Sequence, residues 1–278
     1  MGSCRGLAAL FSGFLVLASV DVAQAGPIED CAAELPGGQP LLYARMPASH
    51  TELCRRGYVT SHDNIAHGPR WTGWHLDPAR AVSCLRRTDD FRTDPDLPPG
   101  AGATPDDYDH TGFDRGHQMP AEDAWPDMAA VHQSFSMANM SPQTPGLNRG
   151  PWKAIEQWSR QLAATPGAGV VYVFDGPVLP PTPATIGPSQ VAVPAAFWKV
   201  VIVSGGAVAF MLPNIDQFTP GPISQFAMPV TAVEIAAGLI FPLPAEFDRT
   251  RAVVLPTVNA AVWRQGHAAA CAMPQPPG

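Results

Sequence analysis

The segment from Asp114 to Glu156 holds the residues whose types and spacing best suit chemistry. Within the tetrapeptide DRGH, His117 follows Arg115 by two residues. A histidine with an unperturbed pKa of about 6.5 can take a proton from water at neutral pH. A guanidinium can stabilise negative charge on a phosphodiester oxygen. The pair is compatible with phosphate chemistry, although a surface Arg–His pair would give the same tetrapeptide.

Two further polar residues follow at a spacing that suits a metal site. Asn148 directly precedes an amphipathic pattern, where its ordinary role is the helix N-cap. Its amide oxygen is also a hard ligand suited to Mg²⁺, which keeps several waters and takes few protein groups. Glu156 lies roughly 12 Å further along a helix axis, and side chains lean toward the helix N-terminus. Glu156 could therefore reach a water of the metal, while direct ligation beside Asn148 looks too far.

The elements that must position these residues can be read from the apolar spacing. Residues 147–164 predict an amphipathic helix with Pro151 in its first turn, because Trp152, Ile155, Trp158 and Leu162 share one face. Strands are predicted over residues 58–60, 71–76, 170–174, 197–203 and 207–212, a loop over 88–109 and a short helix over 230–237. Helices and strands interleave without regular βαβ spacing, which favours an α+β fold.

In this order, the polar residues resemble the signature of the DNA/RNA non-specific endonuclease family, which includes mitochondrial endonuclease G and secreted bacterial nucleases. That signature is DRGH, an Asn-rich segment, a metal-binding Asn and a helix carrying Glu. Here it reads as DRGH ending at His117, Asn139 in NMSPQ, Asn148 in LNRGPW, and Glu156. The resemblance extends over roughly residues 50–245.

The resemblance implies an α+β fold in which a ββα-metal (His-Me) finger is embedded in a mainly antiparallel sheet flanked by helices. It implies one Mg²⁺, Mn²⁺ or other divalent cation, and hydrolysis of DNA and RNA with little sequence specificity to give 5′-phosphate and 3′-hydroxyl ends. The main alternative is an inactive nucleic-acid-binding or inhibitory homologue on the same fold, which predicts loss of the His, Asn or Glu, yet all three are present. An unrelated extracellular hydrolase would instead place His117 far from Asn148.

The resemblance also assigns roles to the core residues. His117 would be the general base that deprotonates the attacking water. Asn148 would be the direct protein ligand of the metal, and Glu156 would hold a metal-bound water. Asp114 is expected to support the loop rather than to perform chemistry.

The resemblance also implies roles for three residues outside this core. Arg115 would contact the phosphate, and Asn139 would organise the site near His117. Members of the family carry another phosphate-contacting arginine upstream, which we assign to Arg87 in LRRTDDFRTDP, with Arg86 and Arg92 as rivals.

The N-terminus has the three parts of a secretory signal peptide over residues 1–25. Arg5 precedes an uncharged, mostly apolar run over residues 7–20, and Ala-Gln-Ala at 23–25 offers a cleavage site. The run is shorter than the roughly 20 residues that span a bilayer as a helix. We therefore expect a secreted or periplasmic protein with no membrane attachment after cleavage, in which residues 26–278 form a single endonuclease domain.

Four cysteines remain after that cleavage, namely Cys31, Cys54, Cys84 and Cys271. An even number in an oxidising compartment favours two disulfides. Three pairings are possible. Cys31–Cys54 closes the shortest N-terminal loop and leaves Cys84–Cys271, but the sequence does not decide between the three.

The composition gives less direct information about the binding partners of the protein. The net charge is −7 and the pI is near 5.5, which argues against binding nucleic acid through overall charge. Proline and glycine, 32 and 25 of 278 residues, predict a folded protein rich in loops. A monomer and a homodimer are both compatible with the sequence.

Overall fold

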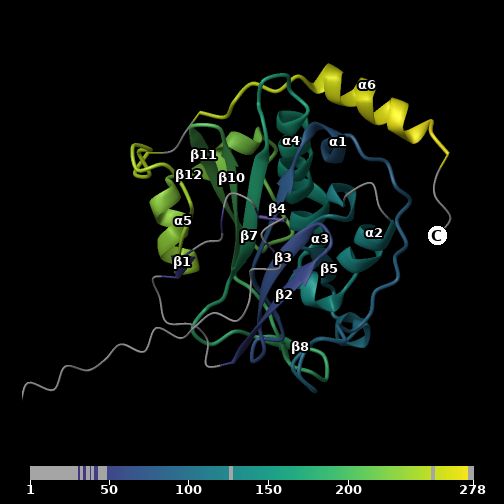
Figure 1. Cartoon of the computed structure of the whole chain (residues 1–278). Coiled ribbons are helices and arrows are strands. Elements are labelled where there is room, and N and C mark those ends of the chain that lie inside the picture. The colour runs from purple at the N-terminus through teal and green to yellow at the C-terminus, as the bar shows by residue number, and fades with distance from the viewer. Residues whose placement is uncertain are drawn as a thin grey trace, which may run out of the picture.

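The computed structural model describes residues 49–124, 128–251 and 254–274, together with 31, 34, 35, 38, 41 and 42. The predicted signal peptide lies outside these residues. Through the centre of the molecule runs a seven-stranded sheet in which every neighbouring pair is antiparallel (Figure 1). Its strands, in spatial order, are β12 (Ala227–Met228), β11 (Gly206–Pro213), β10 (Ala196–Val203), β7 (Val171–Val178), β4 (Gly68–Leu76), β3 (Tyr58–Asp63) and β2 (His50–Arg55).

Both faces of this sheet are covered, which explains its continuous apolar strands. In β10, Phe197 and Val201 enter one hydrophobic cluster, while Trp198 and Val200 enter another on the opposite face. Helix α4 (Lys153–Ala163) covers the first face and α5 (Val230–Ala237) covers the second (Figure 1). The strands predicted from sequence are confirmed. Most are longer than predicted, because polar residues next to the apolar runs also join the ladder.

A separate two-stranded antiparallel sheet stands beside the large sheet. It pairs β5 (Asp114–His117) with β6 (Met140–Gln143). Gly116 lies so close to the Gln143 side chain that an added Cβ would sit 2.3 Å from its Oε1 atom, so any larger residue would displace this buried side chain. The helix that follows β6 completes a ββα unit.

That helix starts earlier than predicted and is interrupted. It begins at α3 (Pro145–Leu147), with Thr144 as the N-cap, passes through a wide turn, η5 (Asn148–Trp152), and continues as α4. Gly150, at φ −105° and ψ −115°, breaks the helical geometry before Pro151. The alternative in which Asn148 only caps the helix is therefore excluded. Thr144-Pro145 supplies the start signal, and the side chain of Asn148 is free for another contact.

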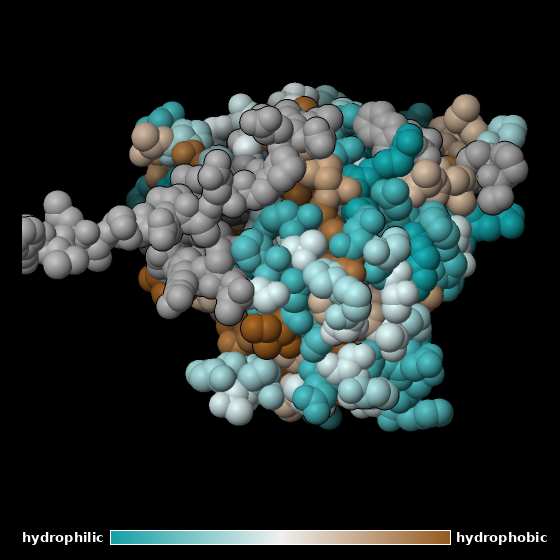
Figure 2. Space-filling view, turned by 60° about the horizontal axis from the view of Figure 1, so that its bottom comes forward, coloured by the Kyte–Doolittle hydropathy of each residue, from teal (hydrophilic) through white to brown (hydrophobic). Residues whose placement is uncertain are grey.

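The remaining elements are short and lie around these units. They are β1 (Leu41–Leu42) paired with β13 (Leu239–Ile240), β8 (Thr185–Ile186) paired with β9 (Val191–Ala192), helices α1 (Pro78–Ala81), α2 (Met128–Ser134) and α6 (Ala260–Cys271), and the single turns η2 (Pro105–Tyr108), η3 (Ala121–Asp123), η4 (Met137–Asn139) and η6 (Ile223–Phe226). None of the helices in the described ranges combines the length and apolar content needed to cross a bilayer. The face in Figure 2 is mostly hydrophilic, with apolar residues confined to small patches.

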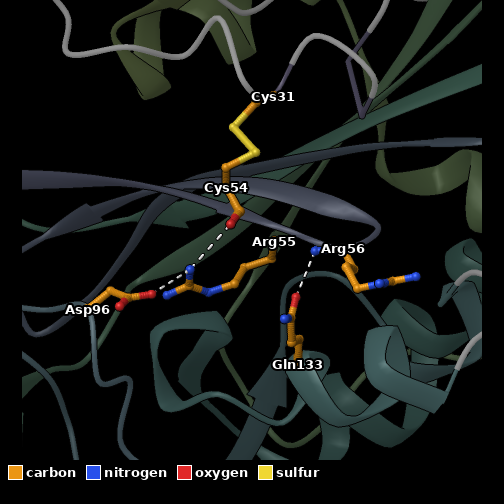
Figure 3. The surroundings of a disulfide bond; sticks show 6 residues. All are labelled: Cys31, Cys54, Arg55, Arg56, Asp96 and Gln133. Atoms are coloured by element: carbon orange, nitrogen blue, oxygen red, sulfur yellow. Dashed lines mark hydrogen bonds and ion pairs between the residues drawn. A yellow bond between two sulfur atoms is a disulfide. The ribbon is translucent and has the colours of Figure 1, made fainter.

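Two disulfides select one of the three cysteine pairings. Cys31 is bonded to Cys54 of β2, with the Cα atoms 5.5 Å apart (Figure 3). Cys84 is bonded to Cys271, with the Cα atoms 5.0 Å apart. The second bond ties the end of α6 to the segment after α1, and Trp263 reinforces this attachment by donating a hydrogen bond from Nε1 to the Ala81 carbonyl at 2.8 Å.

One ion pair is fully buried in the centre of the sheet. The Lys199 ammonium of β10 lies 2.5 Å from a carboxylate oxygen of Asp175 in β7, and neither side chain has any exposed surface. The ammonium also lies 4.9 Å from the ring centroid of Trp74 and 4.2 Å from that of Trp152. Since Trp152 immediately precedes α4, this pair supports the base of the helix that carries Glu156.

We predict that Lys199→Met lowers the free energy of unfolding by about 3–5 kcal/mol, because Asp175 then stays buried without a counter-charge. Urea unfolding of the full chain, followed by tryptophan fluorescence, measures this change. Adding Asp175→Asn should recover much of the loss. If Lys199→Met alone unfolds at the same urea concentration as the wild type, the prediction is contradicted.

Candidate active site

One polar pocket of ≈ 190 Å³ brings together most of the residues predicted to perform chemistry. Its lining comes from the loop after α1, from β5, from η3 and from the η5–α4 helix. The lining residues are Arg87, Arg115, His117, Glu122, Asn148, Arg149, Lys153 and Glu156. His117 and Asn148 thus share one pocket, as the family resemblance requires and as an unrelated hydrolase would not.

His117, the last residue of β5, lies against two aromatic rings. Its ring centroid is 4.9 Å from that of Phe135 and 5.8 Å from that of Phe91, both in edge-on geometry. Burial and, to a smaller extent, the Arg87 guanidinium lower the pKa of His117 to about 3. The imidazole is therefore neutral at pH 7. Its Nε2 atom is buried and has no hydrogen-bond partner among the described residues.

The same two rings support the arginines of the pocket. The Arg87 guanidinium lies 5.1 Å from the Phe135 centroid, and that of Arg115 lies 5.4 Å from the Phe91 centroid. Stacking on an aromatic face restrains the orientation of a guanidinium. Arg87, the residue we assigned upstream, is therefore placed to face a phosphate.

The two rival arginines lie elsewhere. Arg92 pairs with Asp90 at 3.1 Å and, through its backbone, bridges to Ser136. Arg86 is exposed. Neither side chain lines the pocket.

Asn148 is oriented by the first residue of the DRGH motif. Its Nδ2 atom donates a hydrogen bond to Oδ2 of Asp114 at 2.8 Å. Arg149 holds the same carboxylate through two hydrogen bonds, of 2.9 and 2.6 Å. With its nitrogen fixed in this way, Asn148 keeps its amide oxygen free as a ligand. Asp114 thus has a more specific role than the loop support predicted from sequence.

Two carboxylates complete the pocket. Glu156 lies in the first turn of α4 and is 9% exposed. Burial raises its pKa to about 8, against the opposing effect of Lys199 and Arg160. Glu122 behaves differently. Burial alone would raise its pKa, but Arg160 and Arg87 outweigh this effect and lower the pKa, so Glu122 is ionised.

Asn139 lies behind the pocket rather than in its lining. It is fully buried, and its side-chain amide exchanges two hydrogen bonds of 2.9 Å with the backbone of Met119. A third bond, also 2.9 Å, goes to the Ser134 carbonyl. Asn139 therefore fixes the chain just after His117, in agreement with the organising position expected for it.

Sequence reasoning did not single out every residue of the pocket. Glu122, Arg149 and Lys153 line it, and Phe91 and Phe135 support its histidine and arginines. The two extra cations could have been noticed, because they stand four residues apart on the helix that carries Glu156. The two phenylalanines gave no sequence signal, since their proximity to His117 arises only in the folded chain.

The comparison with known proteins agrees with this geometry. The model of the DNA/RNA non-specific endonuclease family matches residues 37–245. The chain belongs to this family. It is accordingly a nuclease, a hydrolase of phosphodiester bonds, and its substrates are nucleic acids.

Individual relatives point the same way. Nuclease C1 of Cunninghamella echinulata var. echinulata is 36% identical over 225 residues, which cover 74% of this chain and 88% of that protein. Mitochondrial endonuclease G of Homo sapiens is 35% identical over 203 residues, or 67% of this chain and 68% of that protein. A solved EndoG/EndoGI complex contains a chain that is 27% identical, with a TM-score of 0.68 over 76% of this chain and 90% of that chain.

The aromatic enclosure of His117 predicts a change in pH dependence. Phe135→Ala exposes the imidazole and should raise its pKa toward the ordinary value of about 6.5. Because a general base must be neutral, the variant should lose activity between about pH 7 and 5.5, where the wild-type imidazole stays unprotonated. The pH profile of kcat/KM measures this shift.

Phe218→Ala is the matched control, since Phe218 contacts Phe226 away from the pocket. Identical acidic limbs for wild type and Phe135→Ala would show that Phe135 does not set the pKa of His117.

Proposed function

We propose that this nuclease hydrolyses the phosphodiester bonds of both DNA and RNA, with little sequence preference, by water attack at the pocket around His117. The observation that carries the proposal is the convergence of His117, Asn148 and Glu156 with two aromatic-supported arginines in one pocket. A neutral histidine, an amide oxygen, a carboxylate and two guanidinium groups together form a set suited to phosphate chemistry.

The donor set fits a divalent cation. The Asn148 amide oxygen would hold the ion directly, and Glu156 would hold it through water. Both are oxygen donors, and a site with few protein ligands is the kind that Mg²⁺ occupies. We therefore propose Mg²⁺ as the cation, with Mn²⁺ as a substitute. When bound, the cation stabilises negative charge on the phosphate and on the leaving 3′ oxygen.

The residues of the chain would carry the remaining steps. His117 takes a proton from the attacking water through its neutral imidazole. Arg115 and Arg87 orient the phosphate and balance its charge. Asn139 holds the backbone after His117, so that the imidazole keeps its direction. The products carry 5′-phosphate and 3′-hydroxyl ends.

A secreted or periplasmic location completes the proposal. The signal-peptide pattern of residues 1–25 supports it, as do the two disulfides, which persist in oxidising compartments. The mature protein would be one endonuclease domain, free of the membrane, acting as a monomer or homodimer. N-terminal sequencing of the exported protein should find Gly26 first, and retention of residues 1–25 would overturn this assignment.

His117→Ala should remove nearly all cleavage of plasmid DNA and of RNA, because it removes the group proposed to take the proton from the attacking water. EDTA should have the same effect on the wild type. Binding of DNA to the variant, measured by fluorescence anisotropy, should be largely retained.

His132→Ala provides a matched control, because His132 lies on α2 and pairs with Asp90 outside the pocket. Full activity of His117→Ala would refute its role as the base. A wild-type protein that binds DNA but does not cut it with any divalent cation would favour the inactive-homologue alternative.

Asp114→Ala should weaken the metal site by releasing the Asn148 side chain. Loss of a residue that orients a ligand typically costs about 10–100-fold in metal affinity or activity. We therefore expect a corresponding rise in the Mg²⁺ concentration that gives half-maximal cleavage. Asp248→Ala, which removes an exposed carboxylate bonded to Thr250, serves as the control. An unchanged Mg²⁺ requirement in Asp114→Ala would exclude the orienting role.

A further inference from the structure

Lys153 is chemically unusual in this chain. The protein has only two lysines, and the other, Lys199, is buried against Asp175. Lys153 is exposed and lines the active pocket. It is therefore the single solvent-accessible lysine side chain, and it lies at the place where a polyanion would bind.

The Lys153 ammonium also has no ionic partner among the described residues. The three arginines of the pocket all have a carboxylate partner: Arg87 pairs with Asp89 at 3.1 Å, and Arg115 and Arg149 pair with Asp109 and Asp114 at 2.6 Å. Within the described ranges no carboxylate lies within ion-pairing distance of the Lys153 ammonium. A ligand phosphate that binds there displaces no existing partner.

The position of Lys153 on the helix places it beside the reaction centre and not in it. It is the first residue of α4 and precedes Glu156 by three residues, which corresponds to about 60° around the helix axis. Toward the N-terminus the surface is open, because a Cβ added to Gly150 would meet nothing within 4 Å and the Arg149 side chain is 72% exposed. Residues 149–153 thus form an open cationic rim of the pocket.

We propose that Lys153, with Arg149 beside it, binds the phosphate next to the scissile one on the same strand; the inference rests on the proposed function of the pocket. A phosphodiester strand carries one negative charge per nucleotide. When one phosphate of a strand is held at His117, the neighbouring phosphate must therefore lie outside the reaction centre, near the rim of the pocket. An ammonium is a compact charge that accepts a phosphate in many orientations, which suits a position without sequence preference. Lys153 is a positioning residue that favours polynucleotides over isolated diesters.

The test compares Lys153→Met with Lys153→Arg and with Arg264→Met, which removes an equal charge from an exposed site on α6. The two substrates are a short single-stranded oligonucleotide and bis(p-nitrophenyl) phosphate, which has no neighbouring phosphate. On the oligonucleotide, Lys153→Met should raise KM about tenfold and reduce the salt slope of binding by about one. Its effect on the small diester should be several-fold weaker. Lys153→Arg should restore most of the loss, and Arg264→Met should leave the slope unchanged.

A direct readout uses the single accessible lysine. In His117→Ala, which should bind without cutting, the oligonucleotide should protect Lys153 from acylation by an amine-reactive ester, as measured by mass spectrometry. Equal losses on both substrates, an unchanged salt slope or absent protection would overturn the proposal. A wild-type protein that cuts neither substrate would instead refute the function of the pocket itself, so the two failures are distinguishable.

Discussion

The carboxylate of Asp114 joins the two halves of the active site. It opens β5, the strand that ends in His117, and it accepts hydrogen bonds from Asn148 and Arg149 across the pocket. His117, the proposed base, and Asn148, the proposed metal ligand, are thereby linked through one side chain. The interrupted helix makes this possible. If Asn148 were an N-cap, its side chain would bond to its own helix, and the β5 carboxylate would have no amide to orient.

Behind that contact the site depends on aromatic support. Phe91 and Phe135 hold His117 edge-on and carry Arg115 and Arg87 on their faces. The rings contribute to the burial of the imidazole, which favours its neutral form, and the guanidinium groups that lie on them line the pocket. The large sheet has a similar arrangement, in which the Lys199 ammonium is enclosed by Trp74 and Trp152 beneath the helix. Cations of the pocket and of the sheet interior are thus held against aromatic rings as well as by ion pairs.

The acidic composition and the nucleic-acid substrate are reconciled by where the cations lie. A net charge of −7 gives no general attraction for a polyanion. Four cations nevertheless line one pocket, and one of them has no carboxylate partner in the described part of the chain. Overall charge therefore argues against binding through a basic surface, while the proposed binding site is local.

The sequence by itself determined the family, the α+β class, the main strands and the order of the DRGH, Asn and Glu residues, because periodicity and short motifs are local properties. Tertiary structure decided the rest. It paired the four cysteines, and it placed Arg87 in the pocket and Arg86 and Arg92 outside it. It also brought Glu122, Phe91 and Phe135 to His117. These outcomes depend on contacts between segments far apart in the chain, and a linear pattern carries no measure of distance in space.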